Sequence, residues 1–497
     1  MVIRMNKSIN NGDMADGAEK KTEGQLLSER LAFELKNCWE KADDEQTRRI
    51  FEFSREYAAM LDAGKTEREF CAECQKRLDA DGYRDIEELL SANEKLAPGM
   101  KVYQNIHGKS LLFAVIGSRP VRGGVNIVGA HIDSPRIDLK TNPVYEDTEF
   151  AMLDTQYYGG IKKYQWIAIP LALHGVIIKE DGGRVEIKVG EEDGDPVFTI
   201  TDLLPHLARL QMDKKAAEFI SGEEMNVLAG SMPFKDEKAK DKVKLNLLRI
   251  LNEKYGISEV DFAGAEIEVV PAGRARDVGF DRSMIGAYGH DDRGCAYAAF
   301  RAVMEIGIGS PPEKTCICVL TDKEEIGSTG NTGANSTLFE NFIAYLCCLD
   351  DPERYSDIAL RQCLAKSQML SADVNSAVDP NYDGVHEKKN ASYLGKGIVL
   401  TKYTGSRGKG GASEANAEFY TKVRRILDEN DVQWQYGDMG KVDQGGGGTI
   451  ALYVANLGVN VLDCGIPVLS MHAPFEVISK IDLYMTYRGY SAFLSNG

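Results

Sequence analysis

The segment VNIVGAHID, residues 125–133, decides how this chain folds. It is apolar up to Val128, and polar side chains, His131 and Asp133, stand at its end. This pattern is typical of a buried parallel strand, whose carboxyl end opens at the edge of a sheet. The segment therefore predicts a parallel sheet covered on both faces.

Short apolar segments and helical patterns alternate on both sides of this strand. The predicted strands are SLLFAVIG (110–117), TCICVLT (315–321), QMLSADV (368–374) and VNVLDCGI (459–466). Helices are predicted at about 293–306, 337–346 and 412–430, and a last one from Ser479 with Asp482 as a capping partner. Strands that alternate with helices predict an α/β fold with three layers, αβα, around a mainly parallel sheet.

The texture of the sequence divides the chain into three parts. Residues 1–25 are polar and without periodicity, which predicts a flexible tail. Helical patterns, including LLSERLAFELKNCWEKA (26–42), follow up to about residue 90. Between 141 and 275, short β-like segments alternate with Gly/Asp-rich turns, which predicts an inserted, smaller β-rich domain. The main domain is then expected over 26–140 and 276–497.

Composition excludes several classes of protein. With 59 basic and 76 acidic residues the net charge is −17, which argues against nucleic acid or an anionic membrane surface as the main partner. There is no run of about 18 apolar residues and no apolar secretory leader. Ten cysteines lack a framework spacing, so a reduced, cytoplasmic protein is expected. Cys71 and Cys74 form the one CxxC, either half of a zinc site or a redox pair, but a buried helix face explains them better.

Potential metal ligands follow the predicted strands. In open α/β sheets, ligands bind outside the carboxyl ends of the strands. Two imidazoles with several carboxylates match a zinc pair bridged by one carboxylate, and histidines favour zinc, cobalt or manganese over calcium or magnesium. The candidates are His131, Asp133, His290, Asp291, Asp292, Asp322, Glu324, Glu325, Asp373 and His472.

Six segments, in this order over nearly the whole chain, make the pattern specific. They are VNIVGAHIDSPRIDLK (125–140), LLPHLA (203–208), AYGHDDRGCAYAAF (287–300), LTDKEEIGSTG (320–330), SADVNSAVDPNY (371–382) and GIPVLSMHAP (465–474). With them the chain resembles the aspartyl-aminopeptidase-type family of dinuclear zinc aminopeptidases. The resemblance implies a three-layer αβα zinc-peptidase domain and a divergent, bacterial-type branch.

The resemblance also implies a ligand set for two zinc ions. Asp291 resembles the carboxylate that bridges both ions. His131 and Asp373 would complete the shell of one ion, and Glu325 and His472 that of the other.

Catalytic roles are implied for two further acids. Glu324 resembles the general base, which takes a proton from a metal-activated water and returns it to the leaving amine. Asp133 would hydrogen-bond the imidazole of His131 and fix its tautomer. The implied activity is removal of N-terminal residues from short peptides, with cobalt or manganese able to replace zinc. The implied assembly is a homo-oligomer, in which dimers build a tetrahedral dodecamer.

Departures from the family pattern affect the substrate pocket. Ser376 and Asp379 stand where many relatives have histidines, so a weak preference for acidic N-terminal residues is expected. His206, in LLPHLA, matches a segment that approaches the site of a neighbouring subunit, with a plain helix-start residue as the alternative. His290 would be an extra ligand or a substrate contact, and otherwise a hydrogen-bonded loop histidine.

Two other functions remain open from the residues alone. A dinuclear-zinc deacylase or carboxypeptidase on a similar scaffold would use the same metal chemistry. A non-catalytic, shell-forming relative would keep the fold, but it would have no need of both Glu324 and Glu325.

Overall fold

The computed structural model describes residues 21–497, so most of the tail expected over residues 1–25 lies outside the described part. The chain divides into two compact units, residues 1–36 and 37–497, and each is described by itself.

In the first unit, α1 (Glu23–Leu31) starts with a capping box. The Thr22 side chain accepts from the backbone N–H of Gln25, and the Gln25 side chain accepts from that of Thr22. The helix predicted over 26–42 is therefore wrong at both ends, because it starts earlier and stops at Leu31.

A nine-stranded sheet forms the centre of the second unit, in the order β1-β2-β3-β13-β4-β14-β18-β16-β17. Its four middle strands are parallel, so their carboxyl ends meet at one edge. Antiparallel pairs flank them on both sides. The middle strands are β13 (Cys316–Thr321), β4 (Asn126–His131), β14 (Gln368–Ser371) and β18 (Asn460–Gly465); the outer ones are β1 (Arg84–Asp85), β2 (Lys101–Ile106), β3 (Ser110–Val115), β16 (Ile398–Thr401) and β17 (Trp434–Tyr436).

Helices cover both faces of this sheet. Along β13, Cys318 packs into one core and its neighbours Ile317 and Val319 into the other, as the period of two in a strand requires. One face is covered by α2 (Asp44–Ala63), α3 (Glu67–Ala80), α7 (His290–Glu305), α10 (Ala417–Glu429) and α12 (Lys480–Asn496). The other is covered by α4 (Ile86–Ala92), α8 (Leu338–Asp350), α9 (Asp357–Lys366) and α11 (Ala451–Ala455). The three-layer αβα fold is confirmed.

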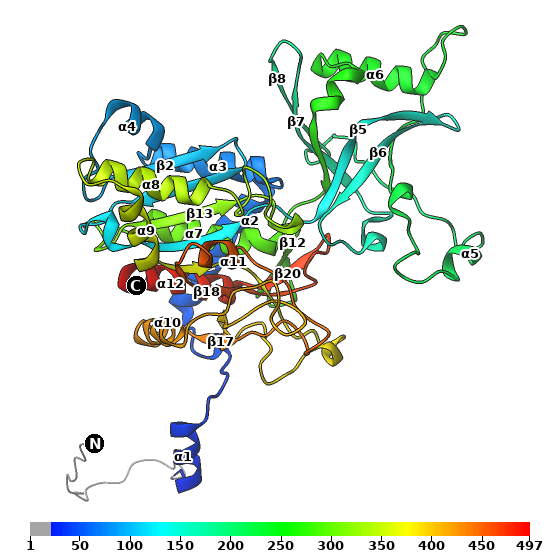
Figure 1. Cartoon of the computed structure of the whole chain (residues 1–497). Coiled ribbons are helices and arrows are strands. Elements are labelled where there is room, and N and C mark those ends of the chain that lie inside the picture. The colour runs from blue at the N-terminus through cyan, green and yellow to red at the C-terminus, as the bar shows by residue number, and fades with distance from the viewer. Residues whose placement is uncertain (1–20) are drawn as a thin grey trace, which may run out of the picture. The chain divides into compact units, whose positions relative to one another are not determined.

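A second sheet of six strands, in the order β8-β7-β10-β5-β6-β9, is antiparallel throughout and has its own core. Figure 1 shows it with α6 (Lys242–Tyr255) beside it. This sheet starts before residue 141, where the inserted domain was predicted to begin. Its elements are β5 (Arg136–Asp147), β6 (Phe150–Tyr158), β7 (Leu171–Ile178), β8 (Arg184–Val189), β9 (Val227–Gly230) and β10 (Glu266–Pro271), and the short α5 (Arg209–Met212) lies between β8 and β9 in sequence.

A third sheet of five short strands is a feature that the sequence did not predict. Its order is β11-β12-β20-β19-β15, and it joins segments far apart in the chain. The strands are too short to show a period. They are β11 (Arg276–Val278), β12 (Met284–Ala287), β15 (Asn375–Ser376), β19 (Pro467–Leu469) and β20 (Glu476–Ser479).

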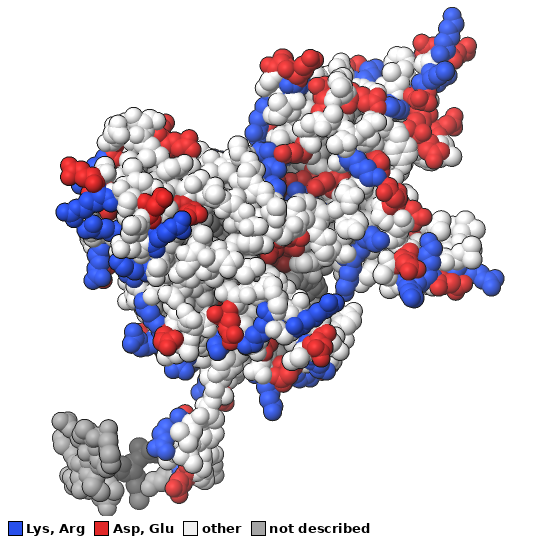
Figure 2. Space-filling model, in the orientation of Figure 1, with Lys and Arg blue, Asp and Glu red and all other residues white. Residues whose placement is uncertain are grey.

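Asp482 does not cap α12 as predicted. Its buried carboxylate accepts instead from the backbone N–H groups of Gly395 and Gly397, at 2.6 and 2.7 Å. Between residues 21 and 497, no helix combines the length and the apolar character that a membrane span needs. On the face drawn in Figure 2, basic and acidic side chains are interspersed.

Candidate metal centre

The middle strands bring the predicted site residues to one edge of the sheet. His131 is the last residue of β4 and lies beside Thr321, the last residue of β13. A short turn of 3-10 helix, Glu324–Ile326, follows β13, and Asp373 follows β14. The third sheet supplies the rest: Asp291 comes after β12, and His472 lies between β19 and β20.

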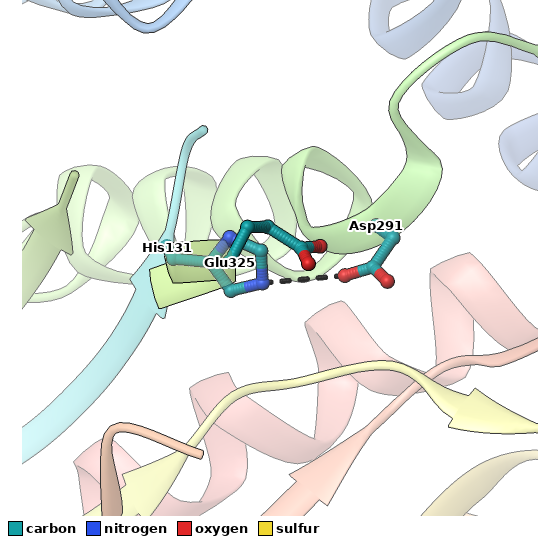
Figure 3. Close-up of side chains that lie close together, drawn as sticks. All are labelled: His131, Asp291 and Glu325. Atoms are coloured by element: carbon teal, nitrogen blue, oxygen red, sulfur yellow. Dashed lines mark ion pairs between the residues drawn. The ribbon is translucent and has the colours of Figure 1, made fainter. Parts of the chain in front are cut away.

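Asp291 lies at the centre of this group. One of its carboxylate oxygens, Oδ1, is 3.2 Å from Nε2 of His131, and the other, Oδ2, is 3.2 Å from Nε2 of His472. Oε1 of Glu325 is 3.4 Å from the same nitrogen of His472. Figure 3 shows the His131 ring pointing toward Asp291, with the Glu325 carboxylate beside them. One carboxylate thus faces two imidazoles, each through a different oxygen.

Asp133 connects His131 to the glutamate turn. His131 Nδ1 lies 3.0 Å from the Asp133 backbone oxygen and 3.3 Å from its carboxylate Oδ1. The carboxylate also accepts from the backbone N–H groups of Glu324 and Glu325, at 3.1 and 3.2 Å. These bonds leave Nε2 of His131 directed at Asp291 and hold both glutamates beside it.

Burial and charge shift the pKa values at this edge. Loss of solvation, together with the nearby Asp133 and Asp291, raises the pKa of Glu324 to about 7. Burial and the Asp291 charge raise that of Glu325 well above its usual range. Burial lowers the pKa of His472, but its contact with Asp291 outweighs this and raises it to about 10. The acids repel one another, and a divalent cation among them would offset that repulsion.

Asp373 and a residue outside the predicted ligand set complete the cluster. Ligand atoms of His131, Asp292 and Asp373 lie within 4.8 Å of one another, and so do those of His131, Asp291 and Glu325. Asp291 and Asp292 have non-helical backbone angles at the start of α7, whose regular part begins at Arg293.

Glu476 holds two of the ligand-bearing segments together, and sequence reasoning missed it. Its buried carboxylate accepts from the backbone N–H of Asp291 at 3.1 Å and from that of His472 at 2.7 Å. Burial, followed by the Asp291 charge, raises the pKa of Glu476 to about 8. Its position four residues after His472 was the only signal in the sequence.

Arg293 and Ser134 fix the backbone of Asp291 from the other side. The Ser134 hydroxyl donates to the Asp291 carbonyl at 2.7 Å, and the Arg293 guanidinium donates to the Ser134 oxygen at 2.9 Å. A second guanidinium nitrogen donates to the Gly64 carbonyl at 2.7 Å, so the buried arginine has a fixed position.

The end of β6 also reaches the site. The Tyr158 hydroxyl donates to the Asp133 carboxylate at 2.8 Å, and the carbonyl of Gly160 lies 2.9 Å from Nδ1 of His472. A Cβ on Gly160 would come within 3.3 Å of that ring, so a glycine fits this close approach.

Two predicted substrate contacts lie elsewhere in the described chain. His290 is buried, its Nδ1 is 2.7 Å from the Tyr57 hydroxyl and its Nε2 is 3.1 Å from the Ile285 carbonyl. Burial lowers its pKa to about 3, so the ring is a neutral hydrogen-bonding group inside the fold. His206 is exposed in the segment before α5. Cys71 and Cys74 are buried in α3.

The donor set fits zinc. Two imidazole nitrogens and several carboxylates surround one position, whereas calcium or magnesium sites consist of oxygen ligands. Both oxygens of the buried Asp292 lack a hydrogen-bond partner within the described residues, and a cation bound beside them would offset their charge. Nδ1 of each histidine lies near a carbonyl oxygen, so Nε2 is the nitrogen free for a metal.

Known proteins are similar to this chain in sequence and fold. The family model for the aminopeptidase I zinc metalloproteases (M18) matches residues 60–494. The chain belongs to the M18 family. The probable M18 family aminopeptidase 1 of Clostridium acetobutylicum is 54% identical over 94% of this chain and 99% of its own length. That of Thermotoga maritima is 45% identical over 93% and 99%.

Solved M18 structures agree with the fold. The crystal structure of aminopeptidase I from C. acetobutylicum matches with a TM-score of 0.87 at 51% identity, over 94% of this chain and 100% of that one. The S. cerevisiae mApe1 dodecamer shares the fold, with a TM-score of 0.71 at 20% identity over 88% and 95%. As an M18 member, the chain is a zinc metalloprotease and an aminopeptidase. None of these relatives favours a deacylase, a carboxypeptidase or a non-catalytic shell protein.

Proposed function

We propose that this M18 aminopeptidase binds two zinc ions per chain, with Asp291 between them. One ion would be held by His131 and Asp373, and the other by Glu325 and His472. The observation that carries the proposal is the Asp291 carboxylate, whose two oxygens each lie 3.2 Å from a different imidazole. Such an arrangement suits a carboxylate shared by two metals.

Glu324 is the proposed general base. Its carboxylate is part-buried, lies 4.0 Å from Nε2 of His131, and makes no close contact with His472 among the described ion pairs. Its pKa of about 7 suits a group that accepts and returns a proton near neutral pH. When bound, zinc supplies an acidified water and polarises the scissile carbonyl. The Asp133 carboxylate keeps Glu324 in place by accepting a hydrogen bond from the Glu324 backbone N–H.

The test starts with metal content. Elemental analysis should find about two zinc ions per chain. Chelation should abolish peptide hydrolysis, and zinc should restore it, with cobalt or manganese as trial substitutes. A metal-free protein with full activity would disprove the proposal.

The substrates we propose are short peptides with a free N-terminus. A matched pair of one short peptide, with its N-terminus free or acetylated, separates the alternatives. The aminopeptidase should cleave only the free form, whereas a carboxypeptidase should cleave both and a deacylase should attack the acetyl group.

We also propose assembly through the domain inserted at 141–275, with 26–140 and 276–497 as the catalytic domain. Its segment 203–212 exposes apolar side chains, among them Leu207 at 70% and Leu210 at 80%. Contiguous exposed apolar surface of this kind marks protein interfaces. Dimers that build a tetrahedral dodecamer, with His206 reaching the partner's site, would cover it. A dodecamer is the form of mApe1.

Light scattering tests the assembly. Leu207→Lys with Leu210→Lys should give smaller particles than the unaltered protein. Val442→Lys, at a side chain that is 88% exposed outside this segment, serves as the control and should leave the size unchanged. A fully active monomer of the unaltered chain would rule the assembly out.

A cytoplasmic location is the last part of the proposal. All ten cysteines lie in the described residues, and each is a free thiol. Free thiols are typical of reducing compartments.

A further inference from the structure

Asp292 is a buried carboxylate that the predicted ligand set does not use. Its exposure is 0%, and neither of its oxygens has a hydrogen-bond partner within residues 21–497. The Cys295 thiol and the His131 backbone N–H lie close enough to favour the ionised carboxylate, but neither makes a hydrogen bond of normal geometry to its oxygens. An unpaired, buried charge is strongly unfavourable, so in its ionised form this carboxylate needs a partner that the protein itself does not supply.

Other buried aspartates of this chain show what a structural role looks like. Asp482 accepts from two backbone N–H groups, those of Gly395 and Gly397. Asp463 accepts from the Thr449 hydroxyl at 2.7 Å. Each carboxylate is thus satisfied by a neighbouring segment. Asp292 differs from both, because both of its oxygens remain without such a partner.

The surroundings of Asp292 point to a cation. Its ligand oxygen lies within 4.8 Å of ligand atoms of both His131 and Asp373. A nitrogen and two carboxylates gathered in this way match the ligands that zinc takes in proteins. Its neighbour Asp291 adds negative charge, and the charge that offsets it here comes from the imidazole of His131, itself a predicted ligand.

We propose that Asp292 is a further metal ligand, on the ion held by His131 and Asp373. This inference rests on the proposed two-zinc site and adds a sixth protein ligand to the five predicted. The ion would thus be held by the adjacent residues Asp291 and Asp292 at the start of α7. Asp292 would therefore determine how tightly this ion is bound, and not the proton transfer assigned to Glu324.

The experiment is a zinc titration of the full chain after chelation. Asp292→Asn keeps the size of the side chain and removes its charge. Against a competing chromophoric chelator, one of the two sites should weaken by about 10- to 100-fold, while the other keeps its affinity. Asp463→Asn, which alters a buried aspartate with its own donor, should bind both ions as the unaltered protein does. Unchanged zinc affinity at both sites in Asp292→Asn would overturn the inference.

Thermal unfolding gives a second readout that a structural role would not produce. Without metal, Asp292→Asn should be at least as stable as the unaltered protein, because the substitution removes a buried charge that has no partner. The rise in Tm on adding zinc should be smaller in the variant. A variant that is equally destabilised with and without zinc would refute the ligand role. Should Asp292→Asn fail to fold, Asp292→Ser is titrated with the same criterion.

These outcomes separate this inference from the proposed function. An unaltered chain that binds fewer than two zinc ions refutes the two-zinc site itself. An unaltered chain that binds two, with a variant that also binds two at equal affinity, refutes only the role of Asp292.

Discussion

Two regions of this protein bury several carboxylates, and they balance the charge in different ways. At the junction of α3 with the second sheet, Arg136 lies 3.5 Å from Glu67, 2.8 Å from Asp138 and 3.1 Å from Glu268. Lys109 adds a contact with Glu67 at 3.6 Å. Here the chain supplies the cations for its own acids.

At the metal centre the ion pairs are of another kind. Within the described residues, Asp291, Glu324 and Glu325 are paired with histidines. A histidine carries a positive charge only when protonated, and its nitrogen is also a metal ligand. The acids of the first region are paired with cations of the chain, whereas those of the second need an added cation. A cluster of buried acids paired with histidines, and without lysine or arginine, therefore marks the functional site more reliably than burial alone.

The largest expected effect concerns Glu324 and Glu325, the adjacent glutamates of the metal centre, which we expect to have different roles. Glu324→Gln should reduce kcat by roughly 10²–10⁴ and leave zinc bound, because it removes the base and not a ligand. Glu325→Gln, the matched control, should instead weaken zinc binding. Steady-state kinetics and elemental analysis of both variants check this. Reversed phenotypes would mean that the two roles are exchanged.

The charge balance of the first region predicts a large effect on stability. Arg136→Met should lower the free energy of unfolding by about 3–5 kcal/mol, since it leaves buried carboxylates without their cation. Lys140→Met removes more exposed pairs, with Glu223 and Asp154, and should cost far less. Denaturant unfolding of the metal-free proteins measures both. Equal, small decreases in the free energy of unfolding of both variants would show that the buried ion pairs of Arg136 do not stabilise this region.

Substitution of Glu476 should have an intermediate effect, because this residue supports the backbone of two predicted metal ligands. In Glu476→Gln one side-chain oxygen becomes an amide, so one of the two backbone N–H groups loses its acceptor. Such a loss costs about 1–3 kcal/mol. We expect zinc affinity and kcat each to fall about tenfold, with KM nearly unchanged. Glu387→Gln, at an exposed glutamate that accepts from the Lys389 backbone, should change neither. A variant with only a lowered Tm would make Glu476 purely structural.

The sequence predicted the middle of the molecule better than its edges. Strands such as β13 and β4 are continuous apolar segments with polar residues at their ends, so pattern alone located the strands and the residues that meet beside them. The third sheet escaped prediction because β15 has two residues and β19 three, too few to show a period. Its pairing depends on contacts between distant segments.

The residues that support the metal ligands were not predicted from the sequence, for a related reason. Glu476 acts through backbone N–H groups, and Tyr158 reaches Asp133 from the second sheet. Neither contact leaves a spacing in the sequence. The sequence placed Asp292 among the candidate ligands next to Asp291, but only the folded structure shows that its oxygens are buried without a partner in the described residues.

The smallest expected effect concerns selectivity among short peptides. An acidic N-terminal side chain needs a cationic or strongly donating partner to offset its desolvation. Ser376 and Asp379 stand in the segment after Asp373, and the Asp379 carboxylate already accepts from the Asn381 backbone N–H at 2.8 Å. It adds negative charge rather than a donor. We therefore expect kcat/KM for Asp and Glu aminoacyl substrates to stay within about tenfold of that for Leu and Lys, roughly 1.4 kcal/mol, measured with one metal. Ser376→His with Asp379→His should shift the ratio toward the acidic substrates, whereas Ser376→Ala should not. A larger acidic preference in the unaltered enzyme would show that another cation of the chain, or of a partner subunit, lines the pocket.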